Sequence, residues 1–429
     1  MIGTGFVGAV TSAVFASLGH TVFAVNRDES KTELFRKGKV PFYEPGLEEL
    51  ILAGVQKGKL RFTTNYEEAV PSSDIVMIAV GTPSAEDGNA DLSQVFASAE
   101  KAAPLLKDGA ILVVKSTVPP GTNSEVSRRV AAITKVSFTM ASLPEYLREG
   151  TAVQDTLHPD RVVIGAVDPR TIKILTDLHT PLTENILVMR PESAQMCKYA
   201  ANAYLATRIT FINQIANLCE VNGADIEEVI RGIGEDRRIG SHYWFPGVGY
   251  GGSCFPKDVR ELSAYARSIG LTDNLMITIN DLNERRMSGL FELFTDQVGG
   301  WEGKKVAVLG LSFKPNTDDL REAPSLKIVP LLQAQNAVVV GYDPMAKDAA
   351  VRTFSANPFP ITDSIDEAIQ DADVVMVLVE WREFSGLEPS YFSSKIKKNG
   401  WIIDTRNIYA HRRKEFHAQG LQYRGIGVV

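Results

Sequence analysis

The chain has 429 residues, enough for two or three domains with separate hydrophobic cores. Its 44% hydrophobic and 23% charged residues are ordinary for a soluble globular protein, and a net charge of −7 without a basic run argues against nucleic acid and weakly against an anionic membrane surface. No apolar run approaches the ~20 residues of a membrane span, no leader pattern precedes Gly3, and three cysteines form no disulfide framework, so we expect a cytoplasmic protein.

A glycine-rich motif opens the chain. Gly3, Gly5 and Gly8 fit the pattern G-x-G-x-x-G, with Phe6 and Val7 between them. A small-residue helix and an apolar run at residues 21–25 follow, as in the αβ half of a dinucleotide-binding unit. The glycines would admit a pyrophosphate to the N-terminus of the helix.

The strand that should precede this motif is nearly absent, because only Met1 and Ile2 stand before Gly3. Such a strand is central in a dinucleotide-binding sheet. We interpret the start as truncated or misplaced and expect weakened cofactor binding. A few added apolar residues should raise thermal stability and cofactor affinity.

The strand end near residue 26 usually carries an acid that binds the adenosine ribose. Here Asn26 and Arg27 stand there, followed by Asp28. Asparagine removes the charge that repels a 2′-phosphate, and arginine can bind one. The residues alone therefore leave both NAD and NADP open.

Two further apolar runs, at residues 74–80 and 111–114, predict buried parallel strands. Each ends in a polar loop, with Thr82 after the first and Thr117 after the second. Ligands bind at the carboxyl edge of open α/β sheets, so both threonines are candidate ligand contacts.

Two carboxylates, Glu145 and Glu149, follow four residues apart. They would share one face if this turn were helical, and such a pair can divide acid and base work. The next strand, at residues 162–164, is expected to close the first sheet.

A long helix is predicted from Pro191 to Val221, buried on most sides because apolar residues recur all round it. Lys198 and Asn202 share one face of it, being four residues apart. A lysine in an apolar stretch is costly unless it is paired or used.

The chain is organised around a glycine-rich stretch at residues 245–258 that contains Cys254. A helix is predicted from Pro256 to Ile269, so Cys254 stands at its N-terminus. The helix dipole and Lys257 favour a reactive thiolate, and Asp258 is a candidate base or water-orienting group.

A second α/β unit begins near residue 301. Its apolar strands at 305–310, 338–343, 373–379 and 400–405 parallel those of the first unit, so we expect two open sheets joined by helices, with a cleft between them. The G-x-G-x-x-G motif is missing there, which argues against a second dinucleotide. Phe313 can stack on a base and Lys314 can meet a diphosphate.

The run Gly-Gly-Ser-Cys-Phe-Pro-Lys-Asp at residues 251–258 resembles the active-site loop of the nucleotide-sugar 6-dehydrogenases, the UDP-glucose enzymes above all. The segments Pro-Glu-x-Leu-x-Glu-Gly at 144–150 and Thr-Asp-Asp-Leu-Arg-Glu at 317–322 match as well, and the resemblance covers essentially the whole chain. It implies an α/β fold of two Rossmann-like sheets joined by a central helical region with one long helix. The expected domains are 1–190 for the dinucleotide, 191–299 for catalysis and dimerisation, and 300–429 for the nucleotide-sugar.

The resemblance also implies roles for individual residues. The implied catalytic residues are Cys254, Lys198, Asn202, Asp258, Glu145 and Thr117. The implied cofactor-binding residues are Gly3, Gly5, Phe6, Val7, Gly8, Asn26, Arg27, Lys31, Thr82, Thr117, Glu149, Lys257 and Arg321. The implied substrate-binding residues are Glu145, Leu147, Lys198, Asn202, Arg238, Phe245, Gly249, Gly251, Phe313, Lys314 and Arg406. No metal is implied. Arg238 would reach the substrate of a neighbouring subunit, which implies a homodimer or a dimer-based oligomer, and the bulky Trp244 leaves the shape of the sugar pocket open.

By resemblance the activity is a four-electron oxidation of UDP-glucose to UDP-glucuronate with two NAD, through a thiohemiacetal and a thioester on Cys254. The family favours NAD over NADP. GDP-mannose or another nucleotide-sugar remains an alternative substrate. Two other classes also stay open: a two-electron NADP-dependent hydroxyacid dehydrogenase, suggested by Asn26 and Arg27, and a non-catalytic nucleotide-sugar binder, suggested by the short first strand.

Overall fold

The computed structural model describes residues 1–428, which divide into two compact units. The first unit holds Met1–Ala201 and Arg260–Thr272, and the second holds Asn202–Val259 and the chain from Asp273 onward. Among the described residues, no helix is both long enough and apolar enough to cross a membrane.

The first unit is built on an open sheet. Its strands are β1 (Val22–Val25), β2 (Leu60–Thr63), β3 (Ile75–Ile78), β4 (Ala110–Val114), β5 (Phe138–Ser142), β6 (Val162–Gly165) and β7 (Ile186–Met189). The order is β3–β4–β5–β6–β7, with β1–β2 on the other side of Ile2, and every pairing is parallel except that of β5 with β6. The expectation that residues 162–164 close this sheet was wrong, because β7 pairs with β6 and forms the edge.

Ile2 occupies the central position of that sheet. It forms parallel bridges to Val25 of β1 and Ile78 of β3, and its N–H donates to the carbonyl of Met77 at 2.7 Å. Ile2 is only 3% exposed, and Met1 and Gly3 also hydrogen-bond to β1, so residues 1–3 fill the place of the expected strand.

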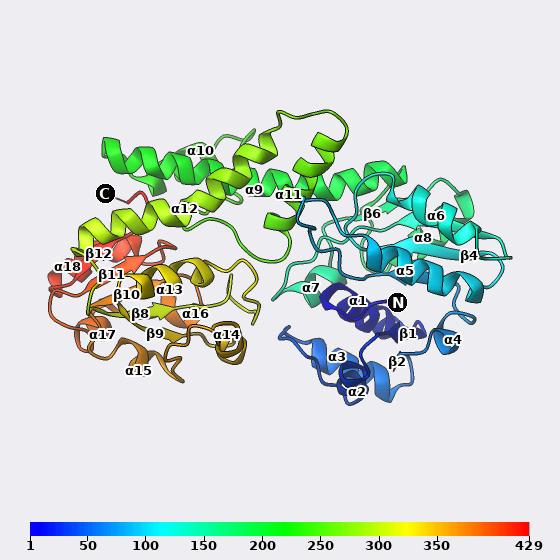
Figure 1. The fold of residues 1–429 in the computed structure, drawn as a ribbon, viewed down its shortest axis with the longest axis horizontal. Coiled ribbons are helices and arrows are strands. Elements are labelled where there is room, and N and C mark those ends of the chain that lie inside the picture. The colour runs from blue at the N-terminus through cyan, green and yellow to red at the C-terminus, as the bar shows by residue number, and fades with distance from the viewer. Residues whose placement is uncertain (429) are drawn as a thin grey trace. The chain divides into compact units, whose positions relative to one another are not determined.

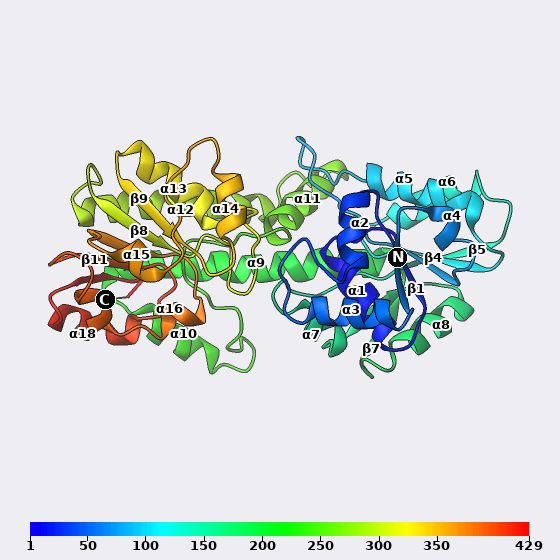
Figure 2. The same cartoon turned by 90° about the horizontal axis from the view of Figure 1, so that it is seen from below.

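Helices cover both faces of the first sheet. They are α1 (Phe6–Ser17), α2 (Glu29–Arg36), α3 (Leu47–Gln56), α4 (Tyr66–Ala69), α5 (Ser93–Ala102), α6 (Thr122–Ala131), α7 (Ala152–Leu157) and α8 (Pro169–His179), with a 3₁₀ turn at Ala103–Leu105. Figure 2 shows α5 and α6 on one face and α8 on the other, in agreement with their contacts to β3, β5 and β6. Small residues let α1 pack closely, since Gly8, Ala9 and Ala13 are all buried.

The middle of the chain is helical. It contains α9 (Pro191–Asn222), α10 (Ile226–Gly234), α11 (Phe255–Ser268) and α12 (Leu275–Val298). α9 is buried on most of its sides, as expected, but one face is exposed from its middle onward. In the single chain Tyr204, Phe211 and Leu218 are 61%, 50% and 60% exposed, and their spacing of seven residues places them along one face.

The second unit carries a wholly parallel sheet in the order β12–β11–β10–β8–β9. Its strands are β8 (Lys305–Leu309), β9 (Val338–Tyr342), β10 (Val374–Val377), β11 (Trp401–Asp404) and β12 (Gln422–Arg424). Its helices are α13 (Pro324–Ala334), α14 (Lys347–Thr353), α15 (Ile365–Ile369), α16 (Arg382–Ser385), α17 (Pro389–Ser393) and α18 (Arg413–Ala418), with a 3₁₀ turn at Ala410–Arg412. Figure 1 shows α13 on one side of this sheet and α15 and α17 on the other.

The two sheets share a topology. In the first, β1 and β3 flank Ile2, and in the second, β9 and β10 flank β8. The predicted class, two Rossmann-like α/β sheets with one long central helix, is confirmed. The three predicted domain boundaries stay predictions.

Candidate active site

The glycine-rich turn of the first unit uses its glycines in two ways. A Cβ on Gly3, whose φ is +94°, would lie 2.4 Å from the carbonyl oxygen of Ala79, and one on Gly8 would lie 2.0 Å from that of Gly3. These two positions have no room for a side chain. A Cβ on Gly5 would meet no atom within 4 Å, so the backbone there borders open space at the N-terminus of α1. This is the arrangement that a dinucleotide pyrophosphate requires, and the residues present fit NAD.

Other predicted cofactor residues stand at the carboxyl ends of the neighbouring strands. The hydroxyl of Thr82, after β3, donates to the carbonyl of Thr117, after β4, at 2.9 Å. Asn26, after β1, donates its side-chain amide to the hydroxyl of Thr4 in the glycine-rich turn at 2.5 Å. Phe6 and Val7 form the first turn of α1. The first unit therefore gathers these residues at one edge of its sheet.

A buried ion pair lies in the same unit. The ammonium of Lys198 on α9 is 3.2 Å from Oε1 of Glu145, with side-chain exposures of 4% and 9%. Lys115, at the end of β4, is also buried, and burial lowers its pKa to about 8, against a smaller raising effect of Glu145. Lys198 is thus a buried, paired cation, as the cost of an unpaired buried charge requires.

The segment that carries Glu145 and Glu149 is not helical, so the argument from their spacing was wrong. Glu145 instead accepts the N–H of Leu147 at 2.8 Å, which turns the chain locally. Pro144 has no N–H to contribute to a helix. Glu149 is half-buried in the turn that follows.

In the second unit Cys254 immediately precedes α11. The N–H of Asp258 donates to the carbonyl of Cys254 at 2.8 Å, which makes Cys254 the N-terminal capping position of the helix. The half-buried sulfur lies 3.5 Å from the hydroxyl of Ser253. The position predicted for Cys254 from the flanking residues is the position observed.

Asp258 is 1% exposed and both its oxygens face a partner. The side-chain amide of Asn202 donates to Oδ2 at 2.5 Å, and the ammonium of Lys257 is 2.7 Å from Oδ1. Asn202 lies one turn after Lys198 on α9. Cys254, Asp258, Lys257 and Asn202 therefore form one polar cluster at the N-terminus of α11.

Buried polar side chains hold the loop before Cys254. Asn283 of α12 accepts the N–H of Tyr250 at 2.9 Å and donates to its carbonyl at 3.0 Å. Asn213 of α9 accepts the N–H of Gly247 at 2.8 Å, and Arg286 of α12 donates to the carbonyl of Gly247, also at 2.8 Å. Burial lowers the pKa of Arg286 to about 10. The residues Asn213, Asn283 and Arg286 were missed by sequence reasoning, because helix spacing alone does not mark them.

The loop packs against the predicted nucleotide-sugar residues. A Cβ on Gly251 would lie 2.1 Å from the carbonyl oxygen of Glu322, and one on Gly252 would lie 2.6 Å from the ring of Phe313. The ammonium of Lys314 is 5.3 Å from the centre of that ring. Arg406 packs against an earlier part of the loop, where a Cβ on Gly247 would be 3.4 Å from its Nη1. Phe313 and Arg406 thus pack against the loop that carries Cys254, and Lys314 lies over the ring of Phe313.

Two predicted arginines are solvent-exposed and bind neighbouring acids. Arg238 pairs with Asp236 at 2.7 Å and Arg321 pairs with Asp319 at 2.6 Å. The bulky Trp244 donates to the carbonyl of Gly240 at 2.9 Å and stacks under the guanidinium of Arg208. Phe245 is 51% exposed beside it, and Gly249 contacts Asn283. Within residues 1–428 no cluster of side chains suits a metal ion.

At the matching edge of the second sheet, the acid is engaged by its own loop. Asp343, at the end of β9, corresponds to Asn26 at the end of β1. It is 2% exposed and accepts hydrogen bonds from the N–H groups of Leu311 and Ser312 at 2.7 and 3.0 Å. The acid that could bind a ribose thus binds its own loop.

These features define an NAD-dependent α/β dehydrogenase with an additional nucleotide-binding sheet. Models of the UDP-glucose/GDP-mannose dehydrogenase family match the chain in three parts: the NAD binding domain at residues 1–183, the central domain at 192–285 and the UDP binding domain at 307–411. The chain belongs to the UDP-glucose/GDP-mannose dehydrogenase family, and NAD is its cofactor.

Individual relatives agree. UDP-glucose 6-dehydrogenase YwqF of Bacillus subtilis (strain 168) is 41% identical over 100% of this chain and 97% of its own length. Among solved structures, a UDP-glucose dehydrogenase from Pyrobaculum islandicum superposes with a TM-score of 0.92 at 36% identity, covering 100% of this chain and 97% of that one. A UDP-D-ManNAc dehydrogenase from Pyrococcus horikoshii gives a TM-score of 0.85 at 25% identity, covering 99% and 98%.

Proposed function

We propose that this enzyme is a UDP-glucose 6-dehydrogenase that oxidises the primary alcohol of UDP-glucose to a carboxylate with two molecules of NAD. The observation that carries the proposal is Cys254 at the N-terminus of α11, beside Asp258, Lys257 and Asn202. A two-electron alcohol dehydrogenase has no use for a cysteine so placed. A four-electron enzyme needs a nucleophile that retains the aldehyde between its two oxidations.

The chemistry proceeds in three stages. The alcohol carbon loses a hydride and the hydroxyl loses a proton, which gives the aldehyde. The thiolate of Cys254 adds to the aldehyde carbon, the resulting oxyanion takes up a proton to give the thiohemiacetal, and the thiohemiacetal loses a second hydride and a proton to give a thioester. Water then cleaves the carbon–sulfur bond and releases the acid and the thiol. NAD accepts one hydride in each oxidation.

The surrounding residues have distinct roles in this proposal. The ammonium of Lys198 stabilises the oxyanion that develops as each hydride leaves. Asn202 shares this work and holds Asp258, to which it donates a hydrogen bond at 2.5 Å. Asp258, Glu145 and Thr117 are the candidates for ordering the hydrolytic water.

The second unit supplies the groups for the nucleotide-sugar. The ring of Phe313 offers a stacking surface for uracil, while Lys314 and Arg406 can meet the diphosphate. Arg406 forms a bidentate pair with Glu380 at 2.6 and 2.8 Å, which fixes its direction. Gly249 and Gly251 have no room for a side chain, because a Cβ would lie 2.5 Å from Oδ1 of Asn283 and 2.1 Å from the carbonyl oxygen of Glu322, so their proposed part in substrate binding is to set the shape of the loop. We further propose that Arg238 reaches the substrate of a second subunit.

The identity of the sugar is a finer matter than the class of reaction. UDP-glucose is proposed because the UDP-glucose enzymes are the more similar relatives, at 41% and 36% identity against 25% for the UDP-D-ManNAc enzyme. A panel of UDP-glucose, UDP-ManNAc and GDP-mannose, scored by NADH formed per sugar consumed, tests this. Two NADH per UDP-glucose is the expected result. One would indicate a two-electron dehydrogenase, and ligand binding without NADH would indicate a non-catalytic binder.

Replacing the cysteine tests the mechanism directly. We expect Cys254→Ala to abolish acid formation while leaving UDP-glucose affinity within about threefold, because the thiol forms a covalent bond only after the first oxidation. Cys254→Ser is expected to accumulate a slowly hydrolysed ester, detectable by mass spectrometry of the intact protein. Acid formed at the wild-type rate by Cys254→Ala would rule the thioester route out.

We also propose a homodimer formed through the exposed face of α9. Tyr204, Phe211 and Leu218 present a stripe of exposed apolar side chains that a second copy could cover. We also propose a cytoplasmic location, based on the composition of the chain.

A further inference from the structure

The residues that follow β1 carry an unusual charge pattern for an NAD enzyme. The adenosine ribose of a bound dinucleotide is expected at this strand end, where an acid ordinarily binds its two hydroxyls. Here the position is Asn26, followed by the exposed Arg27, and Lys31 lies on the first turn of α2. We call Asn26, Arg27 and Lys31 the ribose corner.

Asn26 is fixed as an amide rather than standing in for an acid. Its nitrogen donates to the hydroxyl of Thr4 at 2.5 Å, and its oxygen accepts the N–H of Asp28 at 2.9 Å. A carboxylate could accept but could not donate. The neutral amide therefore ties the glycine-rich turn to the start of α2 and places no negative charge beside the ribose.

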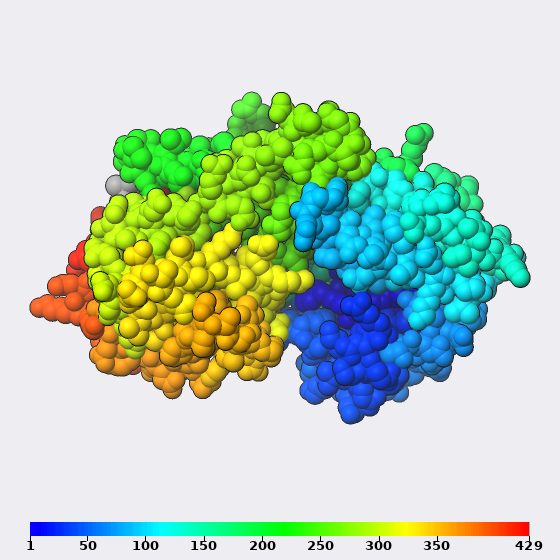
Figure 3. All heavy atoms as spheres, in the orientation of Figure 1, coloured from blue at the N-terminus to red at the C-terminus, as the bar shows by residue number. Residues whose placement is uncertain are grey.

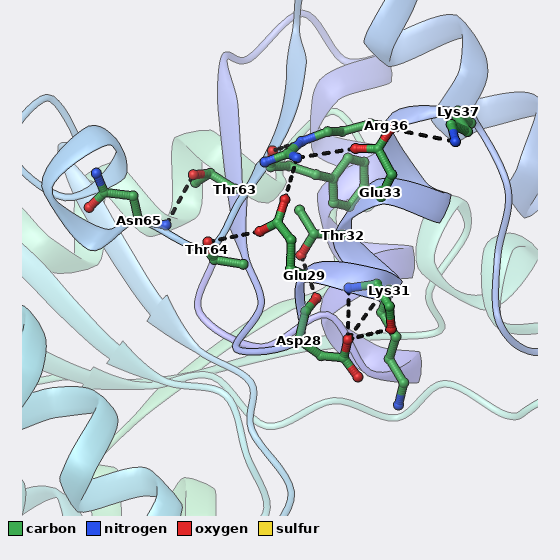
Figure 4. A network of polar contacts seen from close by, with 12 residues as sticks. Asp28, Glu29, Lys31, Thr32, Glu33, Arg36, Lys37, Thr63, Thr64 and Asn65 are labelled. Atoms are coloured by element: carbon green, nitrogen blue, oxygen red, sulfur yellow. Dashed lines mark hydrogen bonds and ion pairs between the residues drawn. The ribbon is translucent and has the colours of Figure 1, made fainter.

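The nearby acids are already engaged. Oδ1 of Asp28 accepts from the N–H groups of Ser30 and Lys31 at 2.9 and 3.2 Å, so this carboxylate caps the N-terminus of α2. Glu29 pairs with Arg36 at 2.6 Å and accepts the hydroxyl of Thr64 at 3.0 Å. Figure 4 shows Glu29 joined to Arg36 and Thr64, and Asp28 joined to the backbone N–H of Lys31.

We propose that the ribose corner accepts the 2′-phosphate of NADP, so that the enzyme binds NADP as well as NAD. Arg27 supplies the guanidinium that pairs with the phosphate, Lys31 adds a second cation, and Asn26 removes the repulsion that an acid would exert. Arg27 and Lys31 are exposed, and the blue segment around α2 lies on the surface of the first unit (Figure 3). The inference rests on the binding of the dinucleotide at the glycine-rich turn.

Direct binding to the full chain tests the inference without turnover. The protein is titrated with NADH and with NADPH in the absence of sugar, and the dissociation constants are read from nicotinamide fluorescence. For the wild type we expect the two constants to lie within about tenfold of each other. An NADPH constant more than about 100-fold weaker than that of NADH would overturn the proposal.

Single substitutions test which residues of the ribose corner bind the 2′-phosphate. Arg27→Ala is expected to weaken NADPH binding about 10- to 100-fold, the loss of a charge-assisted contact, and to weaken NADH binding by a clearly smaller factor. Asn26→Asp is expected to weaken NADPH at least as much, with NADH unchanged or tighter. Lys37→Ala removes another exposed cation at the far end of the same segment and should change neither constant.

The possible results distinguish the role of the ribose corner from the binding of the dinucleotide at the glycine-rich turn. Equal weakening of both coenzymes by Arg27→Ala would overturn the proposed role of the ribose corner. If the wild type bound neither coenzyme, the assignment of the glycine-rich turn would fail along with it. Melting temperatures of all variants within about 3 °C of the wild type would show that the changes act on binding.

Discussion

The first unit contains a buried ion pair and, near it, a further buried lysine. Lys198 and Glu145 are 4% and 9% exposed and only 3.2 Å apart. Lys115 shares their surroundings and its pKa falls to about 8, because its charge is buried too. Glu145 therefore stabilises the charge of both lysines. Removing either member of the Lys198–Glu145 pair would leave the other charge buried without that partner, which is costly.

The ion pair gives a prediction at the residue scale. Glu145→Leu is expected to lower the free energy of unfolding by about 3–5 kcal/mol, because it removes the carboxylate that pairs with the buried ammonium of Lys198. The double variant Lys198→Met/Glu145→Leu should recover at least half of that loss. Denaturant unfolding measures both. Activity should be absent from both variants, and an active double variant would contradict the proposed role of Lys198.

At the scale of elements, the glycines of the turn before α1 have different roles, one in packing and one in ligand binding. Gly8 lies where a Cβ would be 2.0 Å from a carbonyl oxygen, whereas Gly5 borders open space. The same motif thus contains one glycine required by the fold and one left for the ligand.

This contrast is testable with alanine. Gly8→Ala is expected to destabilise the protein by several kcal/mol, because backbone must move to admit the methyl group. Gly5→Ala should leave the melting temperature within about 2 °C, since φ at this residue is −68°, yet weaken NADH binding about tenfold or more. Thermal melts and fluorescence titration distinguish the two. Unchanged NADH affinity in Gly5→Ala would argue against a pyrophosphate at this turn.

The shape of the loop before Cys254 depends on a side chain of α12. Asn283 replaces both backbone partners that Tyr250 would have in regular structure, at 2.9 and 3.0 Å. We expect Asn283→Ala to lower kcat about tenfold or more by loosening the cysteine loop, with KM for UDP-glucose changing less. Ser288→Ala, an exposed change on the same helix, is the control. A kcat equal to the wild type would show that the loop holds its shape without Asn283.

At the scale of the whole molecule, one fold is used twice for different ligands. The first sheet keeps an open glycine turn, whereas Asp343 at the matching position of the second sheet accepts hydrogen bonds from the N–H groups of Leu311 and Ser312. We therefore expect one NADH bound per chain, measured by calorimetry, in the presence or absence of UDP-glucose. A stoichiometry of two would contradict the account of the second sheet.

The sequence determined the architecture of the two sheets. Apolar runs and turn residues are local signals, so the strands, the long helix α9 and the position of Cys254 before α11 could all be predicted from neighbours in the chain. The glycine motif and the unusual pair Asn26 and Arg27 could also be recognised from the sequence. Their expected roles depend only on how far they stand from a predicted strand end.

Only the tertiary structure decided which distant side chains meet. The edge strand β7 was missed, and the helical spacing of Glu145 and Glu149 was wrong because Glu145 folds its own turn around Leu147. The anchoring of the cysteine loop by Asn213, Asn283 and Arg286 joins residues more than thirty positions apart. Such contacts depend on how helices and loops pack in three dimensions, and no local pattern in the chain records them.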